Sequence, residues 1–210
     1  DPMDADTPIA VEARAAILAQ LRDPLPVPER TRVMVVANQK GGVGKTTTTV
    51  NVAAALALHG LRVLVVDLDP QGNASTALGV EHHADVSSAY EVLIEETPVA
   101  DVVQLAPSFD RLYCLPATIH LAGAEIELVS MVARESRLRR ALHRYLDEVA
   151  ADGQRFDYVF IDCPPSLGLL TVNALVGGDE VLIPIQCEYY ALEGLTQLIR
   201  NVDLVKAHLN

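Results

Sequence analysis

A glycine-rich loop with two lysines and two threonines is the first feature of the sequence that could do chemistry. It reads Lys40-Gly41-Gly42-Val43-Gly44-Lys45-Thr46-Thr47 and follows an apolar run. Glycines allow backbone conformations closed to other residues, so several N–H groups can approach one anion. Lys45 is placed to reach the β- and γ-phosphates of a nucleotide, Thr46 to ligate Mg²⁺, and Thr47 to reach the α-phosphate. The loop therefore predicts binding of ATP or ADP with Mg²⁺.

Three aspartates that end apolar runs form the second chemical feature. Asp162 follows the run 158–161, where a carboxylate can hold a magnesium-bound water. Asp67 and Asp69 stand together at the end of another run. For Asp67, a helix cap or a loop hydrogen bond remains open as an alternative to a role near the metal. We expect all three carboxylates to lie near the phosphate loop.

The elements that would position these residues alternate between strand and helix. Short runs rich in Val, Ile and Leu predict five strands, and longer stretches between them predict helices. The strands are expected at residues 33–38, 63–68, 112–115, 158–162 and 181–185, and the helices at 46–59, 136–151, 167–176 and 191–209. Such runs suit strands buried on both faces of a parallel sheet. The pattern predicts a doubly wound α/β fold whose ligand lies at the carboxyl ends of the strands.

Length and composition limit the class of protein. The 210 residues suit one α/β domain, and 50% of them are apolar. No apolar run is long enough to span a bilayer, so we expect no membrane partner. The three cysteines are scattered and form no C-x-x-C pair, which is typical of reduced thiols in the cytoplasm. The net charge of −12 argues against nucleic acid binding over the whole surface, but it does not exclude a local basic patch. One helix could carry such a patch at Arg137, Arg140 and Arg144, although nearby acids favour a solvated helix face.

The chain divides into two predicted segments. Residues 1–31 hold an apolar stripe within 11–21 and then three alternating prolines, which predict an amphipathic helix and an extended linker. That helix either packs on its own domain or is mobile, or it serves as a docking arm for a partner, DNA or a second subunit. Residues 32–210 form the predicted P-loop domain. The last predicted helix runs to the end of the chain, so we expect the domain to be incomplete at its C-terminus.

The phosphate loop departs from the usual pattern because Gln39 replaces the first glycine and the extra Lys40 follows it. This extra lysine marks the deviant Walker A group. The loop resembles that of the ParA-type DNA partition ATPases, and three later blocks are similar to the same family. The matching blocks are residues 38–47, 65–73, 160–166 and 184–195, and the resemblance spans roughly residues 32–210.

This resemblance implies a role for each site residue. Lys40 would reach across a face-to-face homodimer to the nucleotide of the other subunit, and Gly41 would lie where the two loops approach. Asp69 would position the attacking water, while Asp67 would support the magnesium side. Segments around Gly72 and residues 164–165 resemble switches that sense the γ-phosphate.

The resemblance also implies a function. ATP would close the dimer, the dimer would bind DNA without sequence preference on the nucleoid, and a ParB-type centromere-binding protein would stimulate slow hydrolysis. A MinD-like ATPase that positions some other cargo at a membrane or cell pole is the alternative. A metabolic ligase and an iron–sulfur protein are weaker alternatives, because the former would lack Lys40 and the latter would need clustered cysteines.

Overall fold

The centre of the molecule is a sheet with strand order β3-β4-β2-β5-β1-β6 in the computed structural model, which describes residues 25–186 and 191–209. The strands are β1 (Arg32–Val36), β2 (Val63–Asp67), β3 (Gln104–Leu105), β4 (Leu112–Leu115), β5 (Tyr158–Asp162) and β6 (Glu180–Leu182). All neighbours pair in parallel except β3 and β4, which are antiparallel. The prediction of a doubly wound, mainly parallel α/β fold is confirmed.

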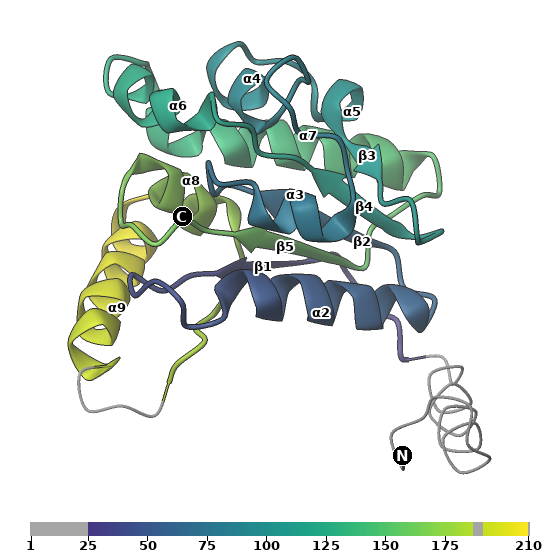
Figure 1. Cartoon of the computed structure of the whole chain (residues 1–210), viewed down its shortest axis with the longest axis horizontal. Coiled ribbons are helices and arrows are strands. Elements are labelled where there is room, and N and C mark those ends of the chain that lie inside the picture. The colour runs from purple at the N-terminus through teal and green to yellow at the C-terminus, as the bar shows by residue number, and fades with distance from the viewer. Residues whose placement is uncertain (1–24, 187–190, 210) are drawn as a thin grey trace, which may run out of the picture.

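The central strands are buried because helices cover both faces of the sheet. Every residue of β2 is buried, and its side chains alternate between two apolar cores. Val63 and Val65 pack on the side of α2 (Lys45–Leu58) and α3 (Asn73–Leu78), whereas Leu64 and Val66 face the opposite layer. Figure 1 shows α2 along one face and the longer helix α7 on the other.

The opposite layer contains several helices of very different length. They are α4 (Ala89–Ile94), α5 (Val99–Val102), α6 (Leu121–Leu128), α7 (Arg137–Ala151), α8 (Leu169–Gly177) and α9 (Ala191–His208), with a short 3₁₀ helix at Arg134–Ser136 before α7. None of the helices among the described residues is long and apolar enough to cross a membrane.

The predicted elements and the observed ones differ mainly in the short pieces. Helices α2, α7, α8 and α9 lie within two residues of their predicted bounds. The count of five strands was wrong for the described residues, since the two-residue strand β3 adds a sixth. Helices α3 to α6 were missed because four to eight residues are too few to display a helical period. The predicted N-terminal helix falls within residues 1–24, outside the described part, so that division of the chain stays a prediction.

Strand register brings the predicted chemistry to one edge of the sheet. Asp162 at the end of β5 is level with Val36 at the end of β1 and with Asp67 at the end of β2. The segments that follow these three strands must therefore start side by side. This arrangement places the acidic end of β5 between the glycine-rich loop, which follows β1, and the acidic end of β2.

Candidate nucleotide site

The glycine-rich loop leads directly into helix α2, whose N-terminus faces the hollow of the site. Gly42 and Gly44 have φ angles of 72° and 92°, in the left-handed region that favours glycine. Gly44 is the N-cap of α2 and offers no side chain to the first-turn N–H groups. Those groups, together with the positive end of the helix dipole, remain available to an anion.

Lys45 is the first residue of α2 and is buried, with 7% of its surface exposed. Its Nζ lies 3.3 Å from the main-chain oxygen of Lys40, to which it donates a hydrogen bond. The side chain thus curls back over the loop instead of extending into solvent. A buried ammonium held against the glycine-rich loop is suited to phosphate oxygens.

Asp162 is held by two threonines of α2. The Thr46 hydroxyl donates to Oδ2 at 2.7 Å, and the Thr49 hydroxyl donates to Oδ1 at 3.1 Å. Burial raises the pKa of Asp162 to about 7, the negative charges of Asp67 and Asp69 add to the rise, and the two threonine bonds oppose it. A carboxylate beside the Thr46 hydroxyl has the donor chemistry that Mg²⁺ and its bound waters require. The structure thus brings Thr46 and Asp162 together, as predicted.

Asp67 is fully buried and its carboxylate is occupied by donors of the protein. Oδ2 accepts from the Ser75 backbone N–H at 2.9 Å and the Ser75 hydroxyl at 2.7 Å, and Oδ1 accepts from the Asp69 N–H at 3.1 Å. Burial raises the pKa of Asp67, while the bonds from Ser75 lower it. These contacts match the alternative in which Asp67 anchors the loop and the first turn of α3. A role of Asp67 on the magnesium side stays a prediction.

Asp69 faces the same hollow as the phosphate loop. Its Oδ1 accepts from the Gln71 N–H at 3.0 Å, which fixes the turn after β2. The hollow has a volume of about 640 Å³, enough for a nucleotide, and its lining is shared by the loop, α2, the turn after β2 and Pro165. The residues that line it are Gly41, Gly42, Gly44, Lys45, Thr46, Thr47, Val50, Asn51, Asp69, Gln71, Asn73, Ala77 and Pro165. Val43 and Lys40 belong to the loop but do not line this hollow.

Lys40 is exposed and contacts the segment after β6. Its Nζ donates to the side-chain oxygen of Gln186 at 3.2 Å, and the Gln186 amide donates to the Gly42 carbonyl at 3.2 Å. Asn38 completes this link, since its Oδ1 accepts from the Lys40 N–H at 3.0 Å and its Nδ2 donates to the Pro184 carbonyl at 2.8 Å. The ammonium of Lys40 therefore lies at the rim of the site, away from the hollow that Lys45 faces.

Several residues that shape the site were not singled out from the sequence. Thr49 supports Asp162, Ser75 supports Asp67, and Asn38 with Gln186 braces the phosphate loop. Thr49 could have been found, because it lies three residues after Thr46 on the same face of α2. The partners Ser75 and Gln186 depend on turns and strand order that no local pattern records.

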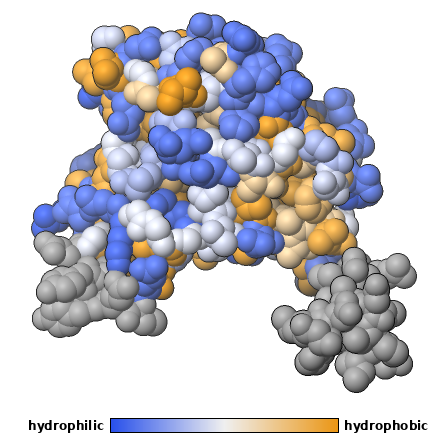
Figure 2. Space-filling view, viewed as in Figure 1, coloured by the Kyte–Doolittle hydropathy of each residue, from blue (hydrophilic) through white to orange (hydrophobic). Residues whose placement is uncertain are grey.

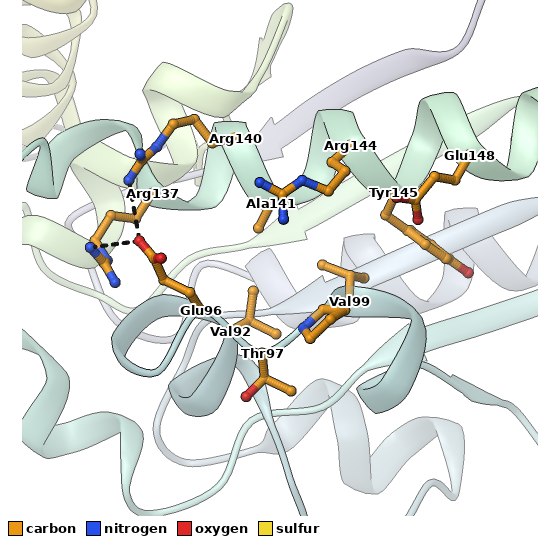
Figure 3. Close-up of a pocket in the computed structure, with 11 residues that line it drawn as sticks. Val92, Glu96, Thr97, Val99, Arg137, Arg140, Ala141, Arg144, Tyr145 and Glu148 are labelled. Atoms are coloured by element: carbon orange, nitrogen blue, oxygen red, sulfur yellow. Dashed lines mark ion pairs between the residues drawn. The ribbon is translucent and has the colours of Figure 1, made fainter.

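The arginines of α7 lie in a separate place, drawn in Figure 3. Arg137 donates to the main-chain oxygens of Leu93 and Ile94 at the end of α4 and pairs with Glu96 at 3.2 Å. Arg140 shares Glu96 at 3.7 Å. The prediction of a solvated face is wrong for Arg137, whose side chain is only 10% exposed because it binds these carbonyls. The prediction holds for Arg140, whose side chain is 53% exposed. The small hollow beside them, of about 130 Å³, is not part of the nucleotide site.

Comparison with known proteins places this site in a family. A family model described as an AAA domain matches residues 31–210. The chain is 56% identical over 180 residues to the sporulation initiation inhibitor protein Soj of Bacillus subtilis, covering 85% of this chain and 68% of that protein. It is 53% identical over 180 residues to the chromosome partitioning protein ParA of Myxococcus xanthus, covering 85% of this chain and 60% of that protein.

The chain belongs to the ParA-type family of deviant Walker A P-loop ATPases. It spans about three fifths to two thirds of the length of these two relatives, at 60% and 68%. Among solved structures, cobyrinic acid a,c-diamide synthase from Mycobacterium smegmatis with ADP and magnesium superposes with a TM-score of 0.77 at 42% identity, covering 86% of this chain and 70% of that one. A putative plasmid partition protein from Borrelia burgdorferi bound to AMPPNP gives a TM-score of 0.72 at 25% identity, covering 85% and 72%.

Proposed function

We propose that this ParA-type protein is an ATP-dependent dimerising switch for partition of a chromosome or plasmid. The observation that carries the proposal is the position of Lys40: its ammonium lies at the exposed rim of a phosphate loop whose own hollow already has Lys45. Lys45 would bind the phosphates of its own subunit, whereas Lys40 lies on the exposed rim of the loop. The Myxococcus xanthus relative named chromosome partitioning protein ParA, at 53% identity, supports a role in partition.

The nucleotide would bind with its phosphates against the loop and the N-terminus of α2. Lys45, Thr46 and Thr47 line the hollow there, and Asp162 stands behind the Thr46 hydroxyl. Thr46 and Asp162 would hold Mg²⁺, with Asp67 on the same side, and the ion would neutralise charge on the phosphates. Asp69 would orient the attacking water, because its carboxylate borders the hollow and is fixed by the Gln71 N–H.

Dimerisation would complete the site. Lys40 of one subunit would reach the phosphates bound by the other, in the manner of an arginine finger supplied in trans. Gly41 would permit close approach of the two loops, since a Cβ built on it meets no atom within 4 Å in the single chain and the space in front of it is open. ATP would then favour the dimer because its γ-phosphate adds an anionic contact for Lys40 across the two subunits.

The closed dimer would bind duplex DNA without sequence preference and release it after slow hydrolysis stimulated by a ParB-type partner. The protein would then act on the nucleoid in the cytoplasm. A net charge of −12 opposes binding to a polyanion, so binding depends on a local basic surface presented twice by the dimer.

The test is retention of the full-length protein on non-specific duplex DNA across a salt series, with ATP and with ADP. Retention that requires ATP and weakens steeply with salt supports the proposal, because counterion release sets the slope. Equal retention with both nucleotides contradicts the switch. ATP hydrolysis without DNA retention under any condition favours positioning of another cargo, the MinD-like alternative.

A biosynthetic ATP-dependent activity is the second candidate. It is favoured by the 42% identity to the Mycobacterium smegmatis protein described as cobyrinic acid a,c-diamide synthase. Partition ranks above it because the Myxococcus xanthus protein named for chromosome partitioning is 53% identical to this chain, against 42% for the synthase. ATP consumption that rises with cobyrinic acid and an amide donor, but not with DNA and a ParB-type protein, would reverse this order.

A further inference from the structure

Helix α6 and the turn after it expose a row of large apolar side chains to solvent. Ile126, Val129 and Val132 follow one another at three-residue spacing and are 79%, 59% and 87% exposed. The opposite side of α6 is buried through Leu121, Ala124 and Leu128. Figure 2 shows apolar side chains gathered over this corner of the molecule, at the upper left. Exposed apolar clusters of this kind mark protein interaction sites more often than isolated apolar residues do. We call Ile126, Val129 and Val132 the α6 patch.

Acidic side chains lie beside the α6 patch. Glu127 follows Ile126 on α6, and the Tyr90 hydroxyl of α4 donates to it at 3.0 Å. The bond to Glu127, burial and the charges of Glu127, Glu95 and Glu91 all raise the pKa of Tyr90, which reports a negative field here. Within residues 25–186 and 191–209, none of these three glutamates forms an ion pair with a basic side chain.

Arg134 is close to the α6 patch, and its charge is paired with that of an acidic side chain. Arg134 donates to the Val129 carbonyl at 2.6 Å and pairs with Glu135 at 2.9 Å. An apolar surface with an acidic rim complements a basic amphipathic segment. Two copies of this chain meeting through the α6 patch would instead oppose like charges, which disfavours a second copy as the occupant.

The α6 patch is also joined to the nucleotide site through the other side of α6. Leu121, Ala122 and Glu125 line a hollow of about 220 Å³ whose far wall is Pro70, next to Asp69, and Pro164 with Ser166, just after Asp162. These are the segments expected to sense the γ-phosphate. A partner that binds the exposed face of α6 would therefore act through this one helix on two segments, the one after β2 and the one after β5.

Glu125 is the closest point of this connection. Its carboxylate lies over Gly168 at the N-terminus of α8, where a Cβ in place of the glycine hydrogen would clash with Oε1. The same oxygen faces the Leu170 N–H at 3.5 Å. A negative charge is favourable at a helix N-terminus, so a shift of α6 changes a contact that holds the start of α8. The loop of residues 163–168, which joins Asp162 to α8, would move with it.

We propose that the α6 patch is the docking surface for a basic amphipathic segment of the ParB-type partner. Docking on this surface would stimulate hydrolysis by shifting Glu125 against the loop after Asp162. The proposal rests on the proposed function, because it names where the partner binds and how the signal reaches the site.

The experiment uses full-length protein with Ile126→Ser and Val129→Ser combined, and Leu58→Ser as the matched control. Leu58 is 58% exposed and lies on α2, in the opposite layer of the fold. Basal hydrolysis, hydrolysis with the ParB-type protein of the same organism plus duplex DNA, partner affinity and melting temperature are measured for each. The double variant should keep basal hydrolysis and lose partner affinity by about tenfold or more, with stimulation lost in proportion. The control should match wild type, and wild-type affinity should fall with salt because the rim is charged.

A second variant, Glu125→Gln, separates docking from transmission. It removes the charge over α8 but leaves the α6 patch intact, so partner affinity should stay within twofold of wild type while stimulation falls. Wild-type stimulation that survives in the double variant would overturn the docking surface and leave the proposed function standing. A lowered melting temperature with unchanged stimulation would show that the patch is packed against another part of the protein. A wild type that the partner does not stimulate would overturn the proposed function and this surface together.

Discussion

The Thr46 hydroxyl donates a 2.7 Å hydrogen bond to the carboxylate of Asp162, which joins the first turn of α2 to the end of β5. Because Thr49 binds the second oxygen of the same carboxylate, the Asp162 side chain is fixed from both sides. The loop that would hold phosphate and the acid that would hold a magnesium-bound water are thus set relative to each other by two side-chain bonds. Replacing Asp162 tests both the metal side of the site and the cost of burying a charge.

Asp162→Asn should raise stability at high pH while abolishing magnesium-dependent hydrolysis. The folded-state pKa of Asp162, about 7, lies above its ordinary value of 3.8, so the folded protein binds this proton more tightly than the unfolded chain. That contribution is fully present below the ordinary pKa and is lost as pH rises toward and through 7. Melting temperatures of nucleotide-free protein in EDTA at pH 5.5 and 8 measure the effect. The wild type should lose more stability than the variant over this interval, and equal losses would contradict burial of the charge.

Lys45→Ala should weaken ATP binding by about 100-fold, because charge-assisted hydrogen bonds to phosphate contribute roughly 1.5–3 kcal/mol each. Calorimetric titration with ATP and Mg²⁺ measures the change. Lys206→Ala is the control, since Lys206 is an exposed lysine near the end of α9, outside the hollow. Unchanged affinity in Lys45→Ala would show that the phosphates bind elsewhere.

Asp69→Ala should bind ATP within a few-fold of wild type but hydrolyse it about 100-fold more slowly, since water positioning contributes effects of that order. Asp69 also accepts from the Gln71 N–H, so Asp69→Asn, which keeps an acceptor oxygen for that bond, serves as the companion variant. Both variants should be slow if the carboxylate acts on water. If Asp69→Asn retains full turnover, the role of Asp69 is to hold the turn.

The parallel core could be predicted because its strands are buried on both faces. Residues 63–66 are all apolar, and in an α/β sequence such a run is typical of a central strand of a parallel sheet. The phosphate loop could be predicted equally well, because its glycines, lysine and threonines lie next to one another in the sequence. The short helices were harder, although Ser88 and Glu91 form a capping box that marks the start of α4.

The contacts that brace the site could not be predicted from local pattern. Asp67 accepts a hydrogen bond from Ser75, eight residues later, only because the turn after β2 folds back. Lys40 bonds to Gln186, 146 residues away in the sequence, because β1 pairs with β6. The two aspartates at the end of β2 look alike in sequence. The carboxylate of Asp67 accepts three hydrogen bonds from the protein, whereas Asp69 borders the open hollow.

The most direct test of the central claim is the molecular mass of the full-length protein in solution, measured by light scattering with ATP and with ADP. The account predicts a dimer with ATP and a monomer with ADP. It also predicts that Lys40→Ala and Gly41→Val bind ATP yet remain monomeric, the first by losing the trans lysine and the second by filling the open space between the loops. A mass that is the same in ATP and ADP, or an ATP-dependent dimer formed by Lys40→Ala, would contradict it.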